Sequence, residues 1–312
     1  MKKLVVSSCP HIRSSSSTKK IMLDVIIALL PAAIMGAVIF GMRALAVLSV
    51  TVAASVFSEF IFNILAKKEQ TIDDLSAIVT GLILGLNLKA DAPLWQCAIG
   101  AVFAIVVVKC LFGGIGCNFA NPAITARVFL LISFAGTLGG GSVPKLSRAP
   151  ELVSGATPLS VLSAGEELPS LLDMFLGLRG GAIGETCAIA IILGFIYLVA
   201  RRVINFETPL VFVGTVFVLS LIFDNSFSIA LYNILAGGLI FGAVFMATDY
   251  VTTPITRSGK MIFAFGCGLI TFLIRKFGSF PEGVSYAILF MNVLSPYIEK
   301  WTTKRPLGGA KK

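Results

Sequence analysis

The sequence predicts an all-α polytopic membrane protein with about ten transmembrane segments, arranged as two inverted repeats of five. Composition is the first observation: 56% of the 312 residues are hydrophobic and only 13% are charged, whereas a soluble domain carries about a quarter charged residues. Secondly, apolar runs near the ~20 residues that cross a bilayer recur along the whole chain. Thirdly, the two halves of the chain share short sequence motifs. These observations leave no room for a sizeable soluble domain.

The first repeat covers residues 21–136 and follows a polar tail, residues 1–20. The tail has no short apolar core before a small-residue cleavage site, so we expect a cytoplasmic tail and no signal peptide. The expected segments of this repeat, of which the third and fifth are short, are Ile21–Gly41, Ala44–Ala66, Leu75–Leu88, Pro93–Phe112 and Pro122–Phe134. Met42 and Arg43 are expected to form the tip of a hairpin between the first two.

The second repeat covers residues 179–299, after a polar loop at residues 137–178 and before a basic tail at residues 300–312. Its expected segments are Gly181–Ala200, Pro209–Phe223, Ile229–Ala247, Met261–Ile274 and Val284–Ile298. Lys and Arg concentrate in cytoplasmic loops of membrane proteins. Their distribution predicts that both termini are cytoplasmic and that the 137–178 loop is extracytoplasmic. The net charge of +9 is explained in the same way, without nucleic acid.

The similarity between the two halves of the chain rests on a short motif, flanked by glycines, that occurs once in each half. Residues 81–85 read Gly-Leu-Ile-Leu-Gly and precede Asp91, and residues 238–242 read Gly-Leu-Ile-Phe-Gly and precede Asp249. Because five segments per half is an odd number, the halves would have opposite orientations, and short or broken helices would meet near the membrane midplane. The alternative is that such motifs recur by chance in apolar sequence.

The cysteine and histidine content limits the chemistry of the chain. None of the six cysteines forms a C-x-x-C pair, which argues against a disulfide framework and against a self-contained iron–sulfur site. His11 is the only histidine, so the chain cannot hold haem between two histidines. We expect no metal site and no catalytic residue in the chain itself.

Thr157 ends a run of small residues, Ser154, Gly155 and Ala156, in the long polar loop. Glycine and alanine would let an enzyme approach a threonine hydroxyl closely, and Pro158 fixes the chain beyond it. Covalent attachment needs such a reachable hydroxyl. An ordinary surface turn would have the same composition, so the residues alone leave both interpretations open.

Several charged residues fall inside or near apolar segments, where a charge is costly and usually faces a cavity or a partner. The carboxylates are Asp24, Glu59, Glu185, Glu207 and Asp249. Interfacial solvation explains those at segment ends, Asp24 and Glu207. For Glu59, a paired structural role and a functional one stay open. Arg127 must be paired if it is buried.

Matches along nearly the whole chain resemble one protein family. Ser154 to Thr157, with Glu151 before them where the family usually has Asp, resembles the motif on which a flavin transferase esterifies FMN to threonine. The wider matches are the runs 113–123, 127–130, 183–186 and 246–249. All of these look like the D subunit of the Rnf complex, whose sister family is the B subunit of the sodium-pumping NADH:quinone reductase.

This resemblance implies a ten-helix subunit related in fold to urea channels. It implies FMN esterified to Thr157 on the extracytoplasmic side and a second, non-covalent flavin (riboflavin) near the cytoplasmic side. From their place beside Gly180 and Gly181, where the backbone can approach a ligand, we expect Glu185 and Thr186 to help shape the FMN pocket, with Arg179 nearby. Asn121, Arg127, Asp249 and Thr252 are the residues expected at a second flavin or ion site.

The family also implies partners and a location. We expect other Rnf subunits, among them a second FMN-carrying subunit and iron–sulfur subunits, together with a flavin transferase for maturation. The complex would pass electrons between ferredoxin and NAD in a bacterial or archaeal plasma membrane, coupled to Na⁺ or H⁺ transport. The alternatives are a channel or secondary transporter without covalent flavin, and the B subunit of the sodium-pumping reductase.

Overall fold

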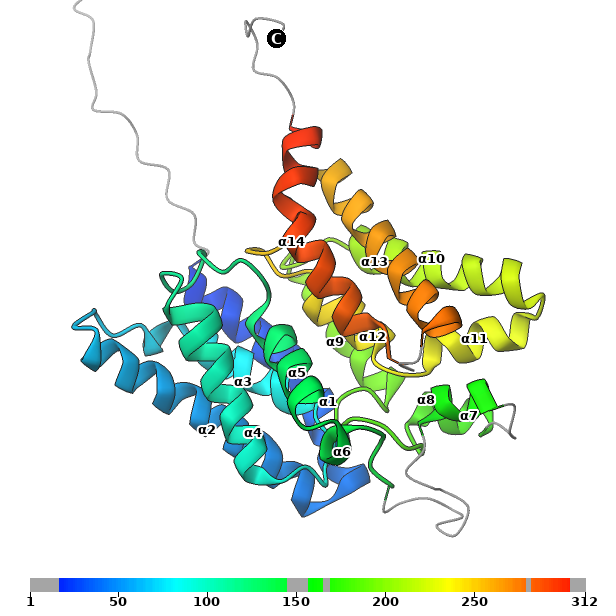
Figure 1. Cartoon of the computed structure of the whole chain (residues 1–312), viewed down its shortest axis with the longest axis horizontal. Helices are drawn as coiled ribbons and strands as arrows, with labels where there is room; N and C mark the ends of the chain where they lie inside the picture. The colour runs from blue at the N-terminus through cyan, green and yellow to red at the C-terminus, as the bar shows by residue number, and fades with distance from the viewer. Residues whose placement is uncertain (1–16, 145–156, 165–168, 279–281, 304–312) are drawn as a thin grey trace, which may run out of the picture.

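A computed structural model describes residues 17–144, 157–164, 169–278 and 282–303. The described part is helical, and its only β-type pairing is an isolated bridge between Ser142 and Gly181. The expectation of an all-α membrane protein is therefore confirmed. In Figure 1 the C-terminal end of α14 lies at the top and helices α7 and α8 lie at the lower right.

The first repeat contains the five expected segments. They are α1 (Thr18–Phe40), α2 (Met42–Leu65), α3 (Ser76–Leu86), α4 (Leu94–Val102), which continues as a π-helix (Phe103–Cys110), and α5 (Pro122–Ser133). A single residue, Gly41, separates α1 from α2, with φ at 79° and its N–H bonded to the carbonyl of Ala37. The hairpin tip is thus Gly41, and the expectation of a tip at Met42 and Arg43 was wrong because both residues already belong to α2.

The polar loop contains three short helices that composition did not predict. They are α6 (Ala135–Leu138), α7 (Pro158–Ala164) and α8 (Leu171–Leu176). Helix α8 ends at Gly177, whose φ of 92° is the left-handed conformation that glycine adopts at helix ends. Thr157 directly precedes α7, so the proposed attachment residue stands at the start of a helical turn.

The second repeat departs from expectation at two places. Its helices are α9 (Ala188–Ala200), α10 (Glu207–Asp224), α11 (Phe227–Leu235), α12 (Leu239–Phe241), which continues as a π-helix (Gly242–Met246), α13 (Arg257–Phe277) and α14 (Val284–Thr302). The segment expected at Ile229–Ala247 is not one helix: α11 and the α12 unit meet at a bend of 61°. Gly237, with φ at 65°, lies in this break.

The other departure is the start of α9, seven residues later than expected. Residues 181–187 are apolar enough to extend a helix, but their backbone is bonded elsewhere. The N–H of Ile183 donates to the carbonyl of Leu88 at 3.0 Å, and the N–H of Gly184 donates to that of Leu86 at 2.8 Å. These tertiary bonds replace the helical ones and fix the 179–187 segment against the end of α3.

Within the described ranges, three helices are long and apolar enough to cross a membrane: α1, α2 and α10. The bent pair of α11 with the α12 unit would be a fourth. Helices α3, α4, α5 and α9 are apolar but shorter. Shortened and broken helices are the elements that inverted-repeat membrane proteins use to line internal sites.

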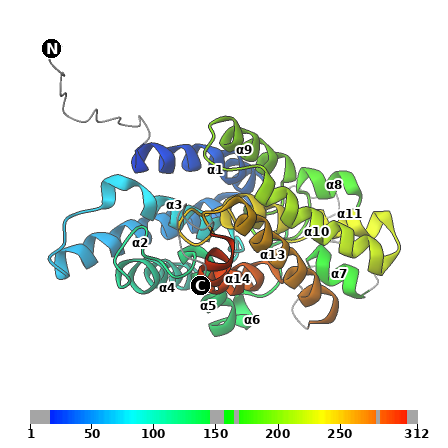
Figure 2. The ribbon, with the colours of Figure 1, turned by 90° about the horizontal axis from the view of Figure 1, so that it is seen from above.

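Packing between the helices follows the same pattern in both repeats. In the first, α2 packs against α3 and α4; in the second, α10 packs against α11 and α13. The repeats meet where α1 packs on α9 and where α5 packs on α14. Figures 1 and 2 show α1 beside α9 and α5 beside α14; in Figure 2 the first pair lies along the upper margin of the molecule. This correspondence is what two related halves would produce.

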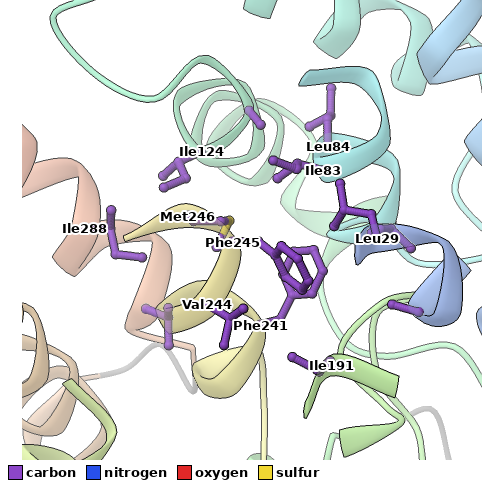
Figure 3. Packing of buried hydrophobic residues seen from close by; sticks show 14 of the residues in the cluster. Leu29, Ile83, Leu84, Ile124, Ile191, Phe241, Val244, Phe245, Met246 and Ile288 are labelled. Atoms are coloured by element: carbon purple, nitrogen blue, oxygen red, sulfur yellow. The ribbon is translucent and has the colours of Figure 1, made fainter. Parts of the chain in front are cut away.

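The centre of the molecule is filled by a layer of buried apolar side chains drawn from both repeats. Figure 3 shows its members converging from helices that lie far apart in the sequence. We call this set the central apolar layer: Leu29, Ile83, Leu84, Ile124, Ile191, Phe241, Val244, Phe245, Met246 and Ile288. Each is at most 5% exposed, so the middle of the interface between the repeats is apolar.

Close approach of α1 and α9 makes Gly194 a sensitive position. A Cβ atom there would lie 2.3 Å from the carbonyl oxygen of Ala28, which is backbone and cannot rotate away. We expect Gly194→Ala to lower the free energy of unfolding by about 1–3 kcal/mol, the usual cost of overpacking, as measured by thermal unfolding in detergent.

The matched control is Gly214→Ala on α10. A Cβ at this position meets nothing within 4 Å, and alanine favours a helix over glycine by up to ~1 kcal/mol. An equal loss of stability in both variants would contradict the close contact at Gly194.

Candidate functional site: the Thr157 cavity

Thr157 lies on the wall of a cavity of about 250 Å³, which we call the Thr157 cavity. It is lined by residues of both repeats and of the loop: Asn87, Leu88, Lys89, Arg127, Leu131, Ala135, Leu138, Gly139, Gly140, Thr157, Ala182, Glu282 and Tyr286. Thr157 itself is only 4% exposed. An exposed turn was one interpretation of this stretch, and the structure instead buries the threonine against an internal space.

The segment that carries Thr157 is fixed by Leu159, two residues further on. Leu159 is buried in a small cluster with Met174 of α8 and Ala236 of the α11–α12 break. A Cβ at Gly237 would lie 2.7 Å from the Cδ1 atom of Leu159. Helix α7 thus packs directly on the break in the second repeat. Ser154, Gly155 and Ala156 lie outside the described residues.

Two cations line the cavity. The Nη1 atom of Arg127 donates to the side-chain oxygen of Asn87 at 2.7 Å, and its Nη2 atom forms an ion pair with Glu282. Lys89 donates to the carbonyl of Gly139 at 3.1 Å. Arg127 belongs to α5, and Glu282 lies just before α14. The expected pairing of Arg127 is therefore found, and it joins the two repeats.

Arg179, Glu185 and Thr186 lie directly behind this wall. Arg179 donates to the carbonyl oxygen of Glu185 at 2.9 Å, and the Oε1 atom of Glu185 accepts from the N–H of Ala182, a lining residue, at 3.0 Å. All three predicted residues are at most 4% exposed. The structure brings them together near Thr157, though none of them lines the cavity itself.

Polar atoms of this group have no hydrogen-bond partner among the described residues. They are the Oε2 atom of Glu185, the Nε and Nη1 atoms of Arg179 and the Oγ1 atom of Thr186. An unpaired buried polar atom costs about 1–3 kcal/mol, so a native site with several of them calls for a physical explanation. A polar ligand or ordered water at this place would supply the missing partners.

The break between α11 and α12 completes the surroundings. Arg275 donates to the carbonyl of Asn233 at 2.6 Å and to that of Ala236 at 3.2 Å, which satisfies two carbonyls at the end of α11. A Cβ at Gly238 would lie 3.0 Å from the Oε2 atom of Glu185. The buried region therefore gathers three arginines (Arg127, Arg179, Arg275) around two glutamates (Glu185, Glu282).

A second, smaller cavity of about 100 Å³ lies on the other side of the central apolar layer. Asn121 and Asp249 are among its lining residues. Asn121 caps α5 by accepting from the N–H of Ala123 at 3.0 Å, and Thr252 donates to the Oδ2 atom of Asp249 at 3.1 Å. Three of the four residues expected at a second site are thus close together. The fourth, Arg127, lines the Thr157 cavity instead.

The sequence did not reveal the partner of Glu59. Its carboxylate accepts from the ammonium of Lys109 at 2.8 and 2.9 Å and from the hydroxyl of Thr71 at 2.5 Å. Lys109 also donates to the hydroxyl of Ser76 at 2.5 Å. Lys109 and Glu59 are 2% and 1% exposed, and the π-helix that ends α4 places Lys109 opposite α2. Glu59 is therefore a member of a buried ion pair.

The two carboxylates near segment ends are paired rather than merely solvated. Asp24 on α1 accepts from Tyr197 at 2.9 Å and forms an ion pair with Arg201 at 3.3 Å. Glu207 at the start of α10 pairs with Arg257. Both cations are largely exposed, so these bonds lie at the aqueous ends of the helices.

Sequence reasoning did not select Asn87, Lys89, Glu282 or Tyr286 as members of the site. Lys89 and Glu282 could have been found by their positions, because each is a charge placed directly beside a short or final apolar segment. Asn87 and Tyr286 carry no such signal, and the packing of α5 against both α3 and α14 brings them to the cavity.

Comparison with known proteins decides the family. Residues 5–308 match the model of the NQR2, RnfD, RnfE family. The chain belongs to this family. The match covers both repeats together with the loop between them. The resemblance to the Rnf D subunit that the sequence motifs indicated is confirmed by the names of the curated relatives.

Curated relatives cover almost the whole chain. One is the D subunit of the Na⁺-translocating ferredoxin:NAD⁺ oxidoreductase complex of Acetobacterium woodii, which is 45% identical over 99% of this chain and 96% of its own length. Its proton-translocating counterpart from Clostridium ljungdahlii is 41% identical over 95% and 94%. The D subunit of the ion-translocating oxidoreductase complex of Stutzerimonas stutzeri is 37% identical over 94% and 93%.

Proposed function

We propose that this protein is the membrane-embedded, flavin-carrying D subunit of an ion-translocating ferredoxin:NAD⁺ oxidoreductase, with FMN esterified to Thr157. The observation that carries the proposal is the position of Thr157 on a cavity that combines apolar walls with a buried cation, Arg127, and a partly exposed one, Lys89. Family membership supports the wider role, because the relatives that cover the chain from end to end bear this name.

The residues of the Thr157 cavity fit a flavin phosphoester. Leu88, Leu131 and Leu138 offer apolar surface for a planar ring. Arg127 and Lys89 offer positive charge for a phosphate diester, which needs charge-assisted hydrogen bonds when it leaves water. Arg127 and Glu282 line the cavity while Arg179, Arg275 and Glu185 lie behind its wall, so this cluster carries a formal excess of one positive charge, to which Lys89 adds a second. One diester anion would offset part of this excess.

The bound flavin would supply the ability to exchange one or two electrons, which links one-electron donors to hydride-level acceptors. The protein's own residues would bind and orient it. Arg127 is held rigidly by Asn87 and Glu282, and a fixed cation tunes a cofactor without reorganising during the reaction. The central apolar layer excludes water from one side of the site.

Other steps would belong to partner subunits, because the sequence contains no iron–sulfur or dinucleotide-binding motif. These partners would include iron–sulfur subunits and a second FMN-carrying subunit, with a flavin transferase needed for maturation. Both termini would be cytoplasmic and Thr157 extracytoplasmic. The names of the relatives include both Na⁺ and proton translocation, so coupling to either ion fits the proposal. The cavity at Asn121 and Asp249 would hold riboflavin or the transported ion.

The burial of Thr157 also bears on maturation. A transferase must reach the hydroxyl, and a residue that is 4% exposed is accessible only when α7 has moved away from the α11–α12 break. Attachment would therefore precede the docking of α7, or require its release.

A denaturing gel of membranes viewed under ultraviolet light tests the proposal. With the transferase present, we expect a fluorescent band at the mass of the wild-type chain and none for Thr157→Ala, because only a covalent flavin survives denaturation. Thr137→Ala is the matched control, since Thr137 also lies in the loop region but bonds Gln96 at 2.9 Å; its band should remain.

A wild-type band that never fluoresces would contradict the proposal. It would favour a channel or secondary transporter, for which the inverted repeat and the intramembrane carboxylates are equally suitable. Fluorescence that persists in Thr157→Ala would place the flavin on another residue.

A further inference from the structure

We propose that a polar pocket at the ends of α9, α10 and α13 binds the phosphate headgroup of an anionic phospholipid. The pocket has a volume of about 150 Å³, and Arg202, Asn205, Thr208, Thr253 and Lys260 are among its lining residues. It is separate from the Thr157 cavity, which shares no lining residue with it. It adjoins the smaller cavity at Asn121 and Asp249, with which it shares Val203, Ile204, Thr248 and Tyr250, but the proposal does not depend on a flavin at either place.

Two cations of the pocket lack an ion-pair or hydrogen-bond partner within the described part of the chain. No ion pair or side-chain hydrogen bond involves Arg202 or Lys260, although the other cations nearby, Arg201 and Arg257, are paired with Asp24 and Glu207. Two carboxylates adjoin the pocket in sequence. Arg257 occupies both oxygens of Glu207, and Asp249, between the lining residues Thr248 and Tyr250, accepts from the hydroxyl of Thr252 and the N–H of Val251. The pocket therefore carries an excess of positive charge.

Thr208 supplies a second, independent observation. Its side chain is 4% exposed, lines the pocket and has no hydrogen-bond partner among the described residues. Because it is the second residue of α10, its backbone N–H also belongs to the first turn, where N–H groups lack helical acceptors and favour anions. Thr208 thus presents a hydroxyl and a helix N-terminus to the same space.

The backbone of Arg202 points to the same conclusion. Arg202 has φ at 57° in the turn that ends α9, a left-handed conformation that glycine usually occupies at this position. A residue with a Cβ atom is disfavoured there by about 1–2 kcal/mol. Arginine at a position suited to glycine is explained if its guanidinium binds something in the adjacent pocket.

The apolar side chains around the pocket favour a lipid headgroup over a free phosphate ion as its ligand. Phe206 and Leu210, which flank Thr208 along the chain, are 52% and 58% exposed, and Tyr250 of the pocket is 49% exposed. Such apolar side chains beside a basic pocket match a headgroup with its acyl chains. Basic pockets between transmembrane helices on the cytoplasmic side bind anionic lipids, and the charge distribution of the sequence predicts a cytoplasmic location for this end of α9 and α10.

The test measures lipid retained by the full chain after detergent purification from vesicles of phosphatidylglycerol or phosphatidylcholine, with quantification by mass spectrometry. We expect the wild type to retain phosphatidylglycerol selectively. Arg202→Gly combined with Lys260→Gln should reduce retention by about tenfold or more, because each lost charge-assisted bond weakens binding by about that factor. Arg202→Gly also relieves the left-handed backbone, so this variant should fold at least as well as the wild type.

Lys300→Gln on α14 is the matched control, since it removes one exposed charge from the same end of the molecule, where Thr302 is hydrogen-bonded to Thr256, without touching the pocket lining; retention should stay at the wild-type level. Equal retention in the double variant and the wild type would overturn the proposal, as would equal retention of the two lipids. If millimolar inorganic phosphate displaces the lipid completely, the pocket is a free-anion site and the lipid assignment is wrong.

Discussion

Lys109→Met is expected to lower the free energy of unfolding by about 3–5 kcal/mol, the largest stability effect that the structure predicts. The substitution leaves the carboxylate of Glu59 buried without its cation, and an uncompensated buried charge costs about this much. Thr71 alone would remain as a donor to Glu59. Thermal unfolding of the purified chain in detergent measures the loss.

Two further variants separate the charge from the volume of the side chain. Glu59→Gln combined with Lys109→Met removes both charges and should recover most of the stability, since replacing a whole buried ion pair is often neutral. Arg257→Gln breaks an exposed pair, which is worth about 0–1 kcal/mol. If the double variant is as unstable as Lys109→Met, the loss comes from packing and the electrostatic explanation fails.

Arg127→Gln is expected to lower the midpoint potential of the proposed flavin at Thr157 by roughly 50–100 mV. At an effective dielectric constant near 20, a cation about 10 Å from a group that gains negative charge stabilises the reduced state by about 1.7 kcal/mol, and 1.4 kcal/mol is about 59 mV for one electron. A redox titration of the purified chain, followed by flavin absorbance, measures the shift.

Glu282→Gln provides the control of opposite sign. It removes the negative charge paired with Arg127, so the potential should rise. Arg127→Lys keeps the charge and should shift the potential less than Arg127→Gln does. A fluorescent gel band in each variant establishes that the flavin is attached before the titration; shifts of the same sign in Arg127→Gln and Glu282→Gln would show that local packing, and not charge, sets the potential.

Apolar runs were sufficient to predict where the longer helices of both repeats lie and in what order, because burial and bilayer contact both demand such runs. They did not predict the short helices α6, α7 and α8. They could not predict the break at Gly237 and Gly238, since residues 229–247 are apolar on both sides of it. The late start of α9 could not be predicted either, because it is caused by contacts between distant parts of the chain. Ile183 and Gly184 bond to the backbone of α3 and the residues just after it, and a tertiary bond leaves no local trace in composition.

In the candidate site, too, single residues could be predicted from the sequence, whereas contacts between distant segments could not. Thr157 could be selected because its neighbours form a recognisable motif, and Glu185 because a carboxylate in apolar sequence is conspicuous. The ion pair between Arg127 and Glu282 joins residues 155 positions apart. The pair between Glu59 and Lys109 spans 50 positions. Neither pairing could be read from spacing, because only the docking of helices from distant segments creates it.

The central apolar layer separates two chemically different spaces by a very short path. On α3, Ile83 lines the smaller cavity, and Asn87, which directly follows the helix, lines the Thr157 cavity. On α5, Ala123 lines the smaller cavity and Arg127 lines the Thr157 cavity. Four residues of helix correspond to a rise of about 6 Å. A dry apolar layer blocks hydrated ions, whereas an electron can tunnel through it. A redox carrier built on this interface would behave as an insulator for Na⁺ and protons and as a conductor for electrons.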